Sequence, residues 1–340
     1  MVVRDKVSIV IPCRNESRYI AGCINSCLLN SYPGHLLEII VVDGMSDDGT
    51  PEIIQKEFGG NKRVKLLENP QRFTPLSLNM GINNSDAEFI MILGAHSTIS
   101  ADYVEKCVGI LKTHSDTGGC GGVLRNICED ASTEVISMAM SSPFGVGTAH
   151  FRTGYKSGYV DTVAFAIYKR EVFDKVGLFD ERLTRNQDDE FNFRVTKAGF
   201  KMYLESEVTA NYFVRSSFSR LYRQYYQYGY WKVFVNRLHG TVTTFRQLVP
   251  PAFVLGLFGL VFLSLLSRYF FGLLIICMCL YLLGAFFAAL QTKANSSRYP
   301  ALIFSFFVIH FSYGLGYLKG IWEFAIMGRN PSRKQETLTR

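Results

Sequence analysis

The chain has 340 residues, a net charge of +7 and a mean hydropathy of +0.11, with 48% hydrophobic residues. This length allows one large domain or two, and the hydropathy is high for a purely soluble enzyme. The 8 cysteines form no CxxC pair, which favours reduced thiols over a disulfide frame or a zinc site. The N-terminus lacks the apolar stretch of a signal peptide, so we expect the front of the chain to stay in the cytoplasm.

Apolar runs alternate with segments of helical periodicity in the front part of the chain, which predicts a mostly parallel α/β sheet. The runs typical of strands buried on both faces are 7–11, 37–42, 64–67 and 89–93. The segments with apolar residues at helical spacing are 19–29, 49–58 and 75–83. Ligands bind beyond the carboxyl ends of strands in such sheets. We therefore expect the loops at 12–16, 43–46 and 94–96 to meet in one crevice.

An acidic segment begins a helix farther along the chain. After a polar turn at 185–187, the helix opens with Asp188, Asp189 and Glu190. Acids in a first turn complement the helix dipole, which is a purely structural explanation. The functional alternative is that one of these carboxylates is a catalytic base. Glu190 and Arg194 are spaced for an ion pair along one helix face, which predicts a role in holding the helix.

Three long apolar runs follow a sharp change in polarity near residue 245, at 249–267, 270–290 and 301–317. Each is close to the ~20 residues needed to cross a hydrocarbon core. The third run carries polar residues and glycines, so a re-entrant or interfacial helix is an alternative there.

The distribution of Lys and Arg around these runs is contradictory. Lys232, Arg237 and Arg246 precede the first run and favour a cytoplasmic front. The basic tail at 326–340 also favours the cytoplasm, which three full crossings would forbid. Either the third run does not cross, or the tail breaks the rule.

Two motifs resemble family-2 glycosyltransferases of the GT-A fold: the strand and loop at 7–16, and the strand that ends at Asp43. The segments that resemble membrane-bound succinoglycan-type exopolysaccharide glucosyltransferases of this family are 142–147, 160–165, 170–173 and 185–190. The resemblance covers most of residues 5–240. It implies four regions: a GT-A domain at 1–215, interfacial amphipathic helices at 216–245, two or three membrane or re-entrant helices at 246–325, and the basic tail.

The resemblance implies a nucleotide-sugar site at the strand ends. Asp43 matches a position that accepts hydrogen bonds from uracil or ribose, and the alternative is a turn-forming aspartate. Arg72 matches a position near the nucleotide or diphosphate, where a fork of donors suits phosphate oxygens, and the alternative is a solvated surface arginine. The other residues assigned to the donor are Pro12, Arg14 and Glu16.

Family members usually carry a DxD-type motif after the fourth strand, whose carboxylates hold Mg²⁺ or Mn²⁺ against the diphosphate. This chain has Gly94-Ala95-His96 there, and succinoglycan-type relatives have Asp-Ala-His. The resemblance therefore implies His96 as the diphosphate or metal contact. An imidazole binds Mn²⁺ but suits Mg²⁺ poorly. Gly94, in place of the first acid, keeps a degenerate enzyme as an alternative.

The resemblance also implies Asp188 as the base that takes the proton of the acceptor hydroxyl, in an attack that inverts the anomeric carbon. Asp189 is the second candidate for the base, and Gln187, where the family has an acid, is assigned to the acceptor. Gln227 and Trp231 are assigned to the acceptor through a partial QxxRW element.

The segment around that element has a competing explanation. Arginines and lysines alternate with tyrosines and phenylalanines between residues 215 and 237, as in helices at a membrane surface. Such a pattern also suits nucleic acid, but the adjoining apolar runs argue against it.

Together these features predict a multi-pass protein of the inner or plasma membrane that moves a hexose from a UDP-sugar to a polyprenyl-diphosphate-linked saccharide. By resemblance the sugar is glucose, and a polysaccharide assembly complex is a further partner. The alternatives are a polyprenyl-phosphate glycosyltransferase and a non-catalytic membrane assembly partner. A processive synthase is disfavoured because Tyr230 replaces the arginine of the QxxRW element.

Overall fold

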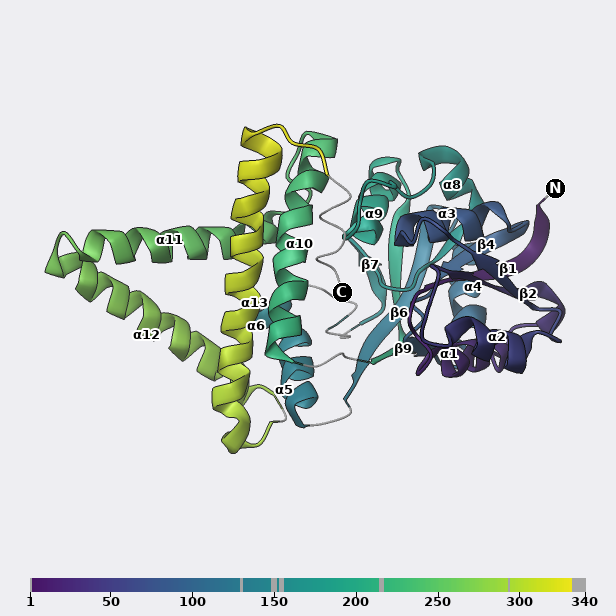
Figure 1. Ribbon diagram of the computed structural model, residues 1–340, viewed down its shortest axis with the longest axis horizontal. Helices are drawn as coiled ribbons and strands as arrows, with labels where there is room; N and C mark the ends of the chain where they lie inside the picture. Colours follow the sequence, from purple (N-terminus) through teal and green to yellow (C-terminus); the bar gives the residue numbers. More distant parts are fainter. Residues whose placement is uncertain are drawn as a thin grey trace. The chain divides into compact units, whose positions relative to one another are not determined.

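The computed structural model describes residues 2–128, 131–147, 152, 156–213, 217–292 and 294–331. Two compact units divide the chain, and Figure 1 labels their helices and strands. The N-terminal unit comprises residues up to 127 together with the stretch that ends at Phe213, and the C-terminal unit comprises the rest. Most of the predicted basic tail, residues 332–340, lies outside the described residues.

A mixed sheet forms the centre of the N-terminal unit. Its strands are β1 (Val3–Cys13), β2 (Leu37–Asp43), β3 (Val64–Glu68), β4 (Ala87–Ile92), β5 (Ser97–Ile99), β6 (Thr117–Ile127), β7 (Gly158–Val160), β8 (Ile167–Lys169) and β9 (Lys201–Phe213). Their order is β3-β2-β1-β4-β8-β6-β9-β5, and β7 also pairs with β9. The first four strands are parallel, as the sequence predicts. The short strands β5, β7 and β8 pair antiparallel with their neighbours, which makes the sheet mixed.

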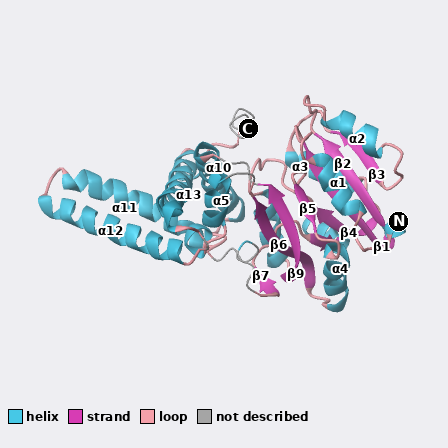
Figure 2. Cartoon of the chain, turned by 90° about the horizontal axis from the view of Figure 1, so that it is seen from below, coloured by secondary structure: helices cyan, strands magenta, loops and turns pink. Residues whose placement is uncertain are grey.

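Helices cover both faces of this sheet (Figure 2). They are α1 (Ile20–Leu28), α2 (Thr50–Phe58), α3 (Thr74–Asn83), α4 (Tyr103–Thr113), α8 (Arg170–Val176) and α9 (Gln187–Lys197), with a 3₁₀ turn at Gly34–Leu36. Alternate residues of β1 point to opposite faces. Ile9 and Ile11 therefore join the core under α1, α2 and α4, whereas Val10 joins the core under α3, α8 and α9. The predicted α/β class is confirmed.

The C-terminal unit is helical. Its elements are α5 (Ala131–Met140), α6 (Pro143–Val146), α10 (Phe218–His239), α11 (Val249–Ser264), α12 (Arg268–Leu290) and α13 (Tyr299–Gly320), with 3₁₀ turns at Phe245–Leu248 and Ser296–Arg298 and a π-helical turn at Ile321–Ile326. In Figure 1, α10 runs alongside α13, and α11 and α12 form a hairpin. Three helical stretches in the described chain are long and apolar enough to cross a membrane: Phe245–Ser264, Arg268–Leu290 and Ser296–Ile326.

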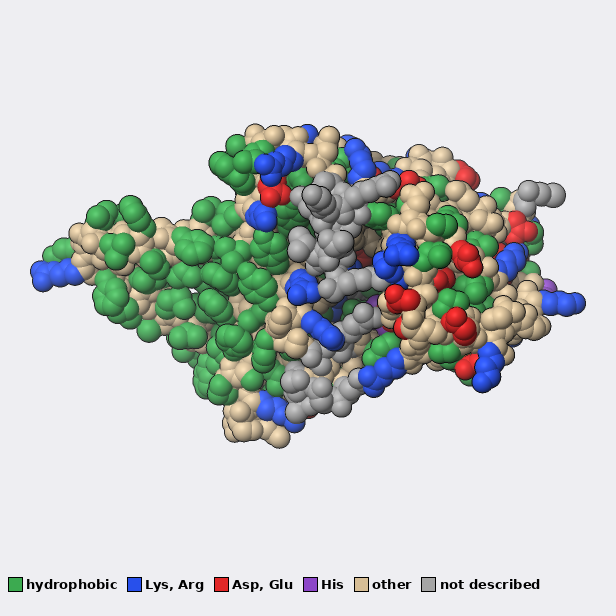
Figure 3. Space-filling view, in the orientation of Figure 1, with side chains coloured by type: hydrophobic (Ala, Val, Ile, Leu, Met, Phe, Trp, Pro, Cys, Tyr) green, Lys and Arg blue, Asp and Glu red, His purple; other side chains and the backbone are tan. Residues whose placement is uncertain are grey.

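These three stretches differ in what surrounds them. Only 17% of the apolar window of each of the first two is buried within the protein, against 50% of the third. The surface of the α11–α12 hairpin is accordingly dominated by hydrophobic side chains (Figure 3). Examples that are at least half exposed are Leu255, Phe258, Phe262, Leu265, Phe271, Ile276 and Leu280. An apolar surface of this extent needs a partner other than water.

Small residues allow α13 to lie against α10 at backbone distance. A Cβ on Gly316 would lie 1.9 Å from the carbonyl oxygen of Tyr226, and one on Gly229 would lie 2.1 Å from that of Tyr313. Glycine is therefore required at both positions, as in the close helix contacts of membrane proteins. Gly316 is one of the glycines that make the third apolar run, 301–317, a weaker candidate for a membrane span. Its role is this close packing of α13 against α10.

The predicted N-terminal domain, 1–215, includes residues 131–147, and the structure corrects this assignment. The structure groups α5 and α6 with the C-terminal helices. His310 of α13 contacts the carbonyl oxygen of Phe144 through Nε2 at 2.8 Å, and the Phe144 ring packs edge-on against Phe306. Arg298 forms an ion pair with Glu134. These contacts attach the segment to α13, although the chain enters it from β6.

We predict that Gly316→Leu lowers the stability of the protein by about 3 kcal/mol, because its Cβ would overlap the backbone of α10. The matched control is Gly259→Leu on α11, where a Cβ meets nothing within 4 Å. Thermal unfolding of both variants in detergent measures the difference. Equal unfolding temperatures would contradict the close packing of α10 and α13.

Candidate active site

The loops that follow β1 and β2 are bound to each other. Cys13 and Asp43 are opposite each other in the parallel register, so both loops leave the same edge of the sheet. The backbone N–H of Gly44 donates to the carbonyl of Cys13 at 2.8 Å, and that of Asn15 donates to the hydroxyl of Ser46 at 2.8 Å. The expected meeting of these two loops is confirmed.

A second set of hydrogen bonds connects the β1 loop to the start of α2. The N–H of Glu16 donates to the Thr50 hydroxyl at 2.9 Å, and that hydroxyl donates to Asp48 at 2.5 Å. The N–H of Ser17 donates to the same carboxylate at 3.0 Å. Burial raises the pKa of Asp48, but the hydrogen bonds from Thr50 and Ser17 outweigh it and lower the pKa to about 2. Asp48 therefore stays ionised at neutral pH and keeps the loop closed.

Asp43 ends β2 and is only 2% exposed. Its Oδ2 accepts the backbone N–H of Ser46 at 2.9 Å, and its Oδ1 accepts the Ser46 hydroxyl at 2.5 Å. These are the contacts of a turn-forming aspartate, which is the structural alternative for this residue. A carboxylate offers about four acceptor positions, so these contacts leave some for a ligand. The role of Asp43 in nucleotide binding remains a prediction.

Two arginines assigned to the donor lie in the loops at this edge. The Arg14 side chain lies over Gly44, whose Cβ would be 3.5 Å from Arg14 Cδ. Its Nε is buried and has no hydrogen-bond partner in the described part of the protein. Arg72 is exposed in a turn with φ of 66°, where its N–H donates to the carbonyl of Asn69. Pro12 is half-buried in β1, one residue before the loop.

The loop after β4 carries His96 to the loop after β1. The N–H of Leu93 donates to the carbonyl of Val10, which continues the pairing of the strands into this loop. His96 Nδ1 lies 3.2 Å from Oε1 of Glu16, and Glu16 is 8% exposed. The third expected loop therefore joins the other two.

No group of three His, Cys, Asp or Glu side chains that could hold a metal ion by itself occurs within the described ranges. His96 offers one ring nitrogen, and Gly94 offers no side-chain ligand. One nitrogen together with the oxygens of a diphosphate is a donor set that Mn²⁺ accepts more readily than Mg²⁺. The residues present therefore fit Mn²⁺ that the ligand itself helps to bind.

Phe165 is a residue of this region that the sequence analysis did not single out. It has φ of 50°, which is rare for an aromatic residue, and its ring would be 3.2 Å from a Cβ on Gly94. Its carbonyl accepts the hydroxyl of the buried Tyr103 at 3.0 Å. No local sequence pattern predicts a positive φ at a phenylalanine. The only sequence feature that connects Phe165 with the site is its position at the end of the motif at 160–165.

The acidic helix start is confirmed. Asn186 precedes α9 with φ of 61°, and Asp188, Asp189 and Glu190 lie in the first turn. Asp188 is exposed, and its Oδ1 accepts the backbone N–H of Asp189 at 2.9 Å. Burial raises the pKa of the Tyr168 phenol on β8, and the negative charge of Asp188 makes a smaller contribution in the same direction. The Asp188 carboxylate is therefore open to solvent, and its charge acts on Tyr168 of β8.

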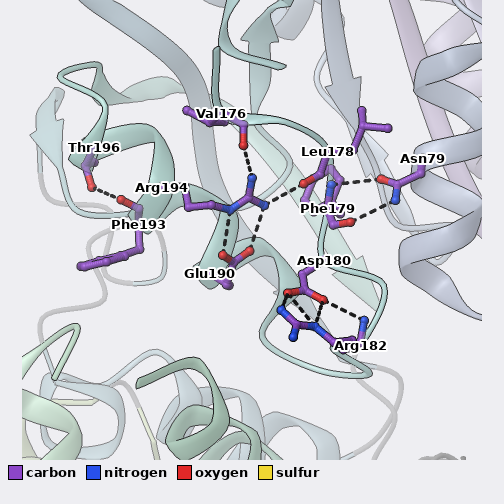
Figure 4. Close-up of polar contacts among 10 residues, drawn as sticks. All are labelled: Asn79, Val176, Leu178, Phe179, Asp180, Arg182, Glu190, Phe193, Arg194 and Thr196. Carbon is purple, nitrogen blue, oxygen red and sulfur yellow. Dashed lines mark hydrogen bonds and ion pairs between the residues drawn. The ribbon is translucent and has the colours of Figure 1, made fainter. Parts of the chain in front are cut away.

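Glu190 and Arg194 form the predicted i,i+4 pair (Figure 4). Arg194 Nε and Nη2 donate to the two carboxylate oxygens at 2.7 and 2.9 Å. Its guanidinium also donates to the carbonyls of Val176 and Leu178. Glu190 is 2% exposed. This bidentate pair attaches α9 to the end of α8 and leaves Asp188 to face solvent.

The loop before α9 is held from the other side by Asn79 of α3. The Asn79 amide donates to the carbonyl of Phe179 and accepts the N–H of Phe179, both at 3.0 Å (Figure 4).

Gln187, assigned to the acceptor, has a buried Oε1 without a hydrogen-bond partner in the described residues. An unsatisfied buried acceptor of this kind is costly unless a ligand or water binds it.

Trp231 does not fit its predicted role of stacking on an acceptor sugar. It lies in α10 of the C-terminal unit, is 2% exposed, and packs against Phe234 and Phe324. A ring buried in this way has no face open to a sugar. Gln227 of the same helix is 6% exposed. Burial against α13 and its π-helical turn explains the aromatic residues of this segment better than sugar binding does.

The N-terminal unit thus has a mixed α/β sheet with the loops after β1, β2 and β4 at one edge, which is the architecture of the GT-A class of transferases. The description "Glycosyl transferase family 2" belongs to a family model that matches residues 8–177, half of the chain. The chain therefore belongs to glycosyltransferase family 2 and is a glycosyltransferase.

The relatives that match this chain include two that are covered over about three quarters or more of their own length. A Methanococcus voltae protein named dolichyl N-acetyl-alpha-D-glucosaminyl phosphate 3-beta-D-2,3-diacetamido-2,3-dideoxy-beta-D-glucuronosyltransferase is 29% identical over 93% of this chain and 97% of its own. Succinoglycan biosynthesis protein ExoA of Rhizobium meliloti is 28% identical over 74% of this chain and 76% of its own.

The fold also occurs among solved structures. The mannosyltransferase PcManGT of Pyrobaculum calidifontis, in complex with GDP-Man and Mn²⁺, superposes with a TM-score of 0.65 at 16% sequence identity. The superposition covers 93% of this chain and 87% of that one. The resemblance to succinoglycan-type transferases of the GT-A fold is confirmed.

We predict that Glu190→Ala destabilises the protein by about 3 kcal/mol, because it leaves the Arg194 guanidinium partly buried without its counter-charge. Glu171→Ala is the control: its carboxylate is 59% exposed and 3.7 Å from Lys169, so a change within about 0.5 kcal/mol is expected. Thermal unfolding in detergent measures both variants. Similar losses for the two would contradict a structural role for the buried pair.

Proposed function

We propose that this protein is an inverting hexosyltransferase that moves a sugar, glucose by resemblance, from a UDP donor to a lipid-linked saccharide at a membrane. The observation that carries the proposal is the meeting of Arg14, Glu16 and His96 with the Asp43 loop at one edge of the sheet, in a chain of glycosyltransferase family 2. This edge is where ligands bind in open α/β sheets.

The donor is bound by the loops after β1, β2 and β4. Asp43 accepts hydrogen bonds from the uridine, and Arg14 donates to the diphosphate, because its buried Nε has no other partner in the described residues. Arg72 approaches the same phosphates from its exposed turn. Pro12 lies in β1, one residue before the loop that carries Arg14.

Asp188 is the base in this proposal. It takes the proton of the acceptor hydroxyl while the hydroxyl oxygen bonds to the anomeric carbon. The bond from that carbon to the diphosphate oxygen breaks, its electron pair leaves with UDP, and the configuration inverts. The exposure of Asp188 and the attachment of its helix by Glu190 and Arg194 support this role. Gln187 orients the acceptor with its unsatisfied Oε1.

Mn²⁺ is the cation we propose, held by His96 together with the diphosphate. When bound, it would neutralise charge that develops on the leaving UDP. Two observations support it: the nitrogen ligand at the DxD position, and the Mn²⁺ in the complex of PcManGT.

The acceptor is proposed to be a saccharide on a polyprenyl diphosphate. The name of the Methanococcus voltae relative contains a dolichyl-linked sugar phosphate, and that of the Rhizobium meliloti relative refers to succinoglycan biosynthesis. A lipid carrier in the same bilayer as the apolar helices would raise the effective concentration of the acceptor. Other members of a polysaccharide assembly complex are expected partners.

One observation favours a second function. Gly94 removes the first acid of the DxD motif, which is what a degenerate transferase kept as a membrane assembly partner would look like. Binding of UDP decides between the two: calorimetry of the detergent-solubilised protein with UDP and Mn²⁺ detects binding if the protein is an enzyme and none if it is a scaffold.

The direct test uses membranes that contain the protein, radiolabelled UDP-sugars, and either Mn²⁺ or Mg²⁺. We expect label from UDP-glucose in the lipid extract, more with Mn²⁺ than with Mg²⁺. Mild acid should then release the label as an oligosaccharide. Release as a free monosaccharide would instead identify a polyprenyl-phosphate glycosyltransferase, and absence of labelled lipid with every UDP-sugar would overturn the proposed reaction.

We predict that Asp188→Asn lowers kcat by about 10²- to 10⁴-fold, because the amide cannot accept the proton of the acceptor. The affinity for UDP should not change. Asp189→Asn is the matched control and should retain activity near that of the wild type. A greater loss of activity in Asp189→Asn than in Asp188→Asn would move the role of base to Asp189.

We further propose that α11 and α12 cross the membrane and that α13 does not. The hairpin exposes apolar side chains to its surroundings, whereas half of the apolar window of α13 is buried within the protein and α13 packs along α10. Two crossings return the chain to its starting side. Arg246 before the hairpin and Arg329 after it would then both face the cytoplasm, as the positive-inside rule requires.

Reporter fusions in a bacterial host test this topology. We predict that alkaline phosphatase is active when inserted at the 265–267 turn and inactive after residue 331, where a fluorescent protein should fold instead. Active phosphatase at both positions would mean that the third stretch also crosses.

A further inference from the structure

His96 occupies the position of a metal-binding acid, yet its ring is already held by the protein. Nδ1 lies 3.2 Å from Oε1 of Glu16, and the ring packs edge-on against Tyr212 with centroids 4.9 Å apart. The backbone carbonyl of His96 accepts the N–H of Phe213. The side chain is 23% exposed, so the held ring still reaches solvent.

The contact with Glu16 determines what the other ring nitrogen can do. An ionised carboxylate only accepts hydrogen bonds, so Nδ1 is the nitrogen that carries the proton when Glu16 is ionised. In neutral His96 the lone pair is then on Nε2, which can bind a cation. Histidines that bind metals commonly donate their other N–H to a carboxylate, which orients the ring and raises the basicity of the ligand.

The space at position 94, where related transferases carry the first acid, is limited by neighbouring side chains. A Cβ at position 94 would lie 3.2 Å from Cε1 of Phe165, which is closer than an ordinary van der Waals contact. Ser97 nearby is 1% exposed, and its hydroxyl has no partner in the described residues. A side chain at position 94 would thus require the Phe165 ring to shift by a few tenths of an ångström, whereas the ring of His96 is held by Glu16 and Tyr212.

We propose that Glu16 is a positioning residue, which fixes the His96 ring so that Nε2 faces the cation on the donor diphosphate. This inference rests on the proposed function and changes one assignment: the Glu16 carboxylate acts through His96 rather than on the nucleotide. The pair supplies the orientation that two acids supply in a DxD motif. Glu16 is suited to this task because its backbone is bound to Thr50 and its side chain is buried.

The test is a double-mutant cycle on UDP affinity, measured by calorimetry with Mn²⁺ in the full-length protein in detergent. We expect Glu16→Ala and His96→Ala each to weaken UDP binding by about 10- to 100-fold. The double variant should be no weaker than His96→Ala alone, because Glu16 acts through His96. Glu16→Gln should retain most of the affinity, since its amide oxygen can still accept the Nδ1 proton. Asp47→Ala, which removes an exposed acid next to Ser46, is the control and should bind as the wild type does.

A spectroscopic measurement separates orientation of the ring from folding of the loop. Pulsed electron paramagnetic resonance of bound Mn²⁺ with UDP should detect coupling to a ring nitrogen in the wild type. The coupling should be absent in His96→Ala and reduced in Glu16→Ala, at unchanged unfolding temperature. A wild-type complex without nitrogen coupling would overturn the inference.

The outcomes also separate this inference from the proposed function. If the wild type binds UDP and transfers sugar but the losses from Glu16→Ala and His96→Ala multiply in the double variant, only the positioning role is wrong. If the wild type binds neither UDP nor GDP with Mn²⁺, the proposed function fails and the inference fails with it.

Discussion

The register between β1 and β2 is the constraint on which the rest of the N-terminal unit depends. Glu38 is 5% exposed and lies opposite Ser8, whose hydroxyl it accepts, while Lys6 and Lys65 pair with the same carboxylate. A slip of one residue would leave this buried charge without its partners, at a cost of several kcal/mol. The same register sets Cys13 opposite Asp43 at the far end of the strands. A polar contact at one end of the strands thereby aligns the loops after β1 and β2 at the other end.

The part of the unit that carries Asp188 depends on a different kind of contact. The loop between α8 and α9 is attached to α3 by Asn79, and α9 is attached to the end of α8 by Arg194. The turn that carries Arg72 precedes α3, where Asn69 bonds to Ser77 of that helix. One helix therefore joins the Arg72 turn to the loop that leads into Asp188. The spacing between the two halves of the proposed site is set by packed secondary structure rather than by free loops.

Features that are local in sequence could be predicted, and features that join distant residues could not. The four parallel strands are continuous apolar runs because both of their faces are buried, and the Glu190 pair with Arg194 follows from helix geometry alone. The contact between Glu16 and His96 joins residues 80 apart, and the position of Phe165 depends on a backbone conformation that its sequence does not favour. Trp231 was misassigned for a physical reason. An aromatic stripe on a helix has the same pattern whether it faces a sugar, a lipid or another helix.

The attachment of residues 131–147 to the C-terminal helices has a consequence for modularity. The chain leaves the N-terminal unit after β6, contributes α5 and α6 to the helical unit, and returns for β7. A cut near residue 215 would not release an intact soluble enzyme, since it would strip Phe144 and Glu134 of His310, Phe306 and Arg298. The two units are therefore interdependent along the chain, and recombination or truncation between them would have to move the α5–α6 segment together with the C-terminal helices.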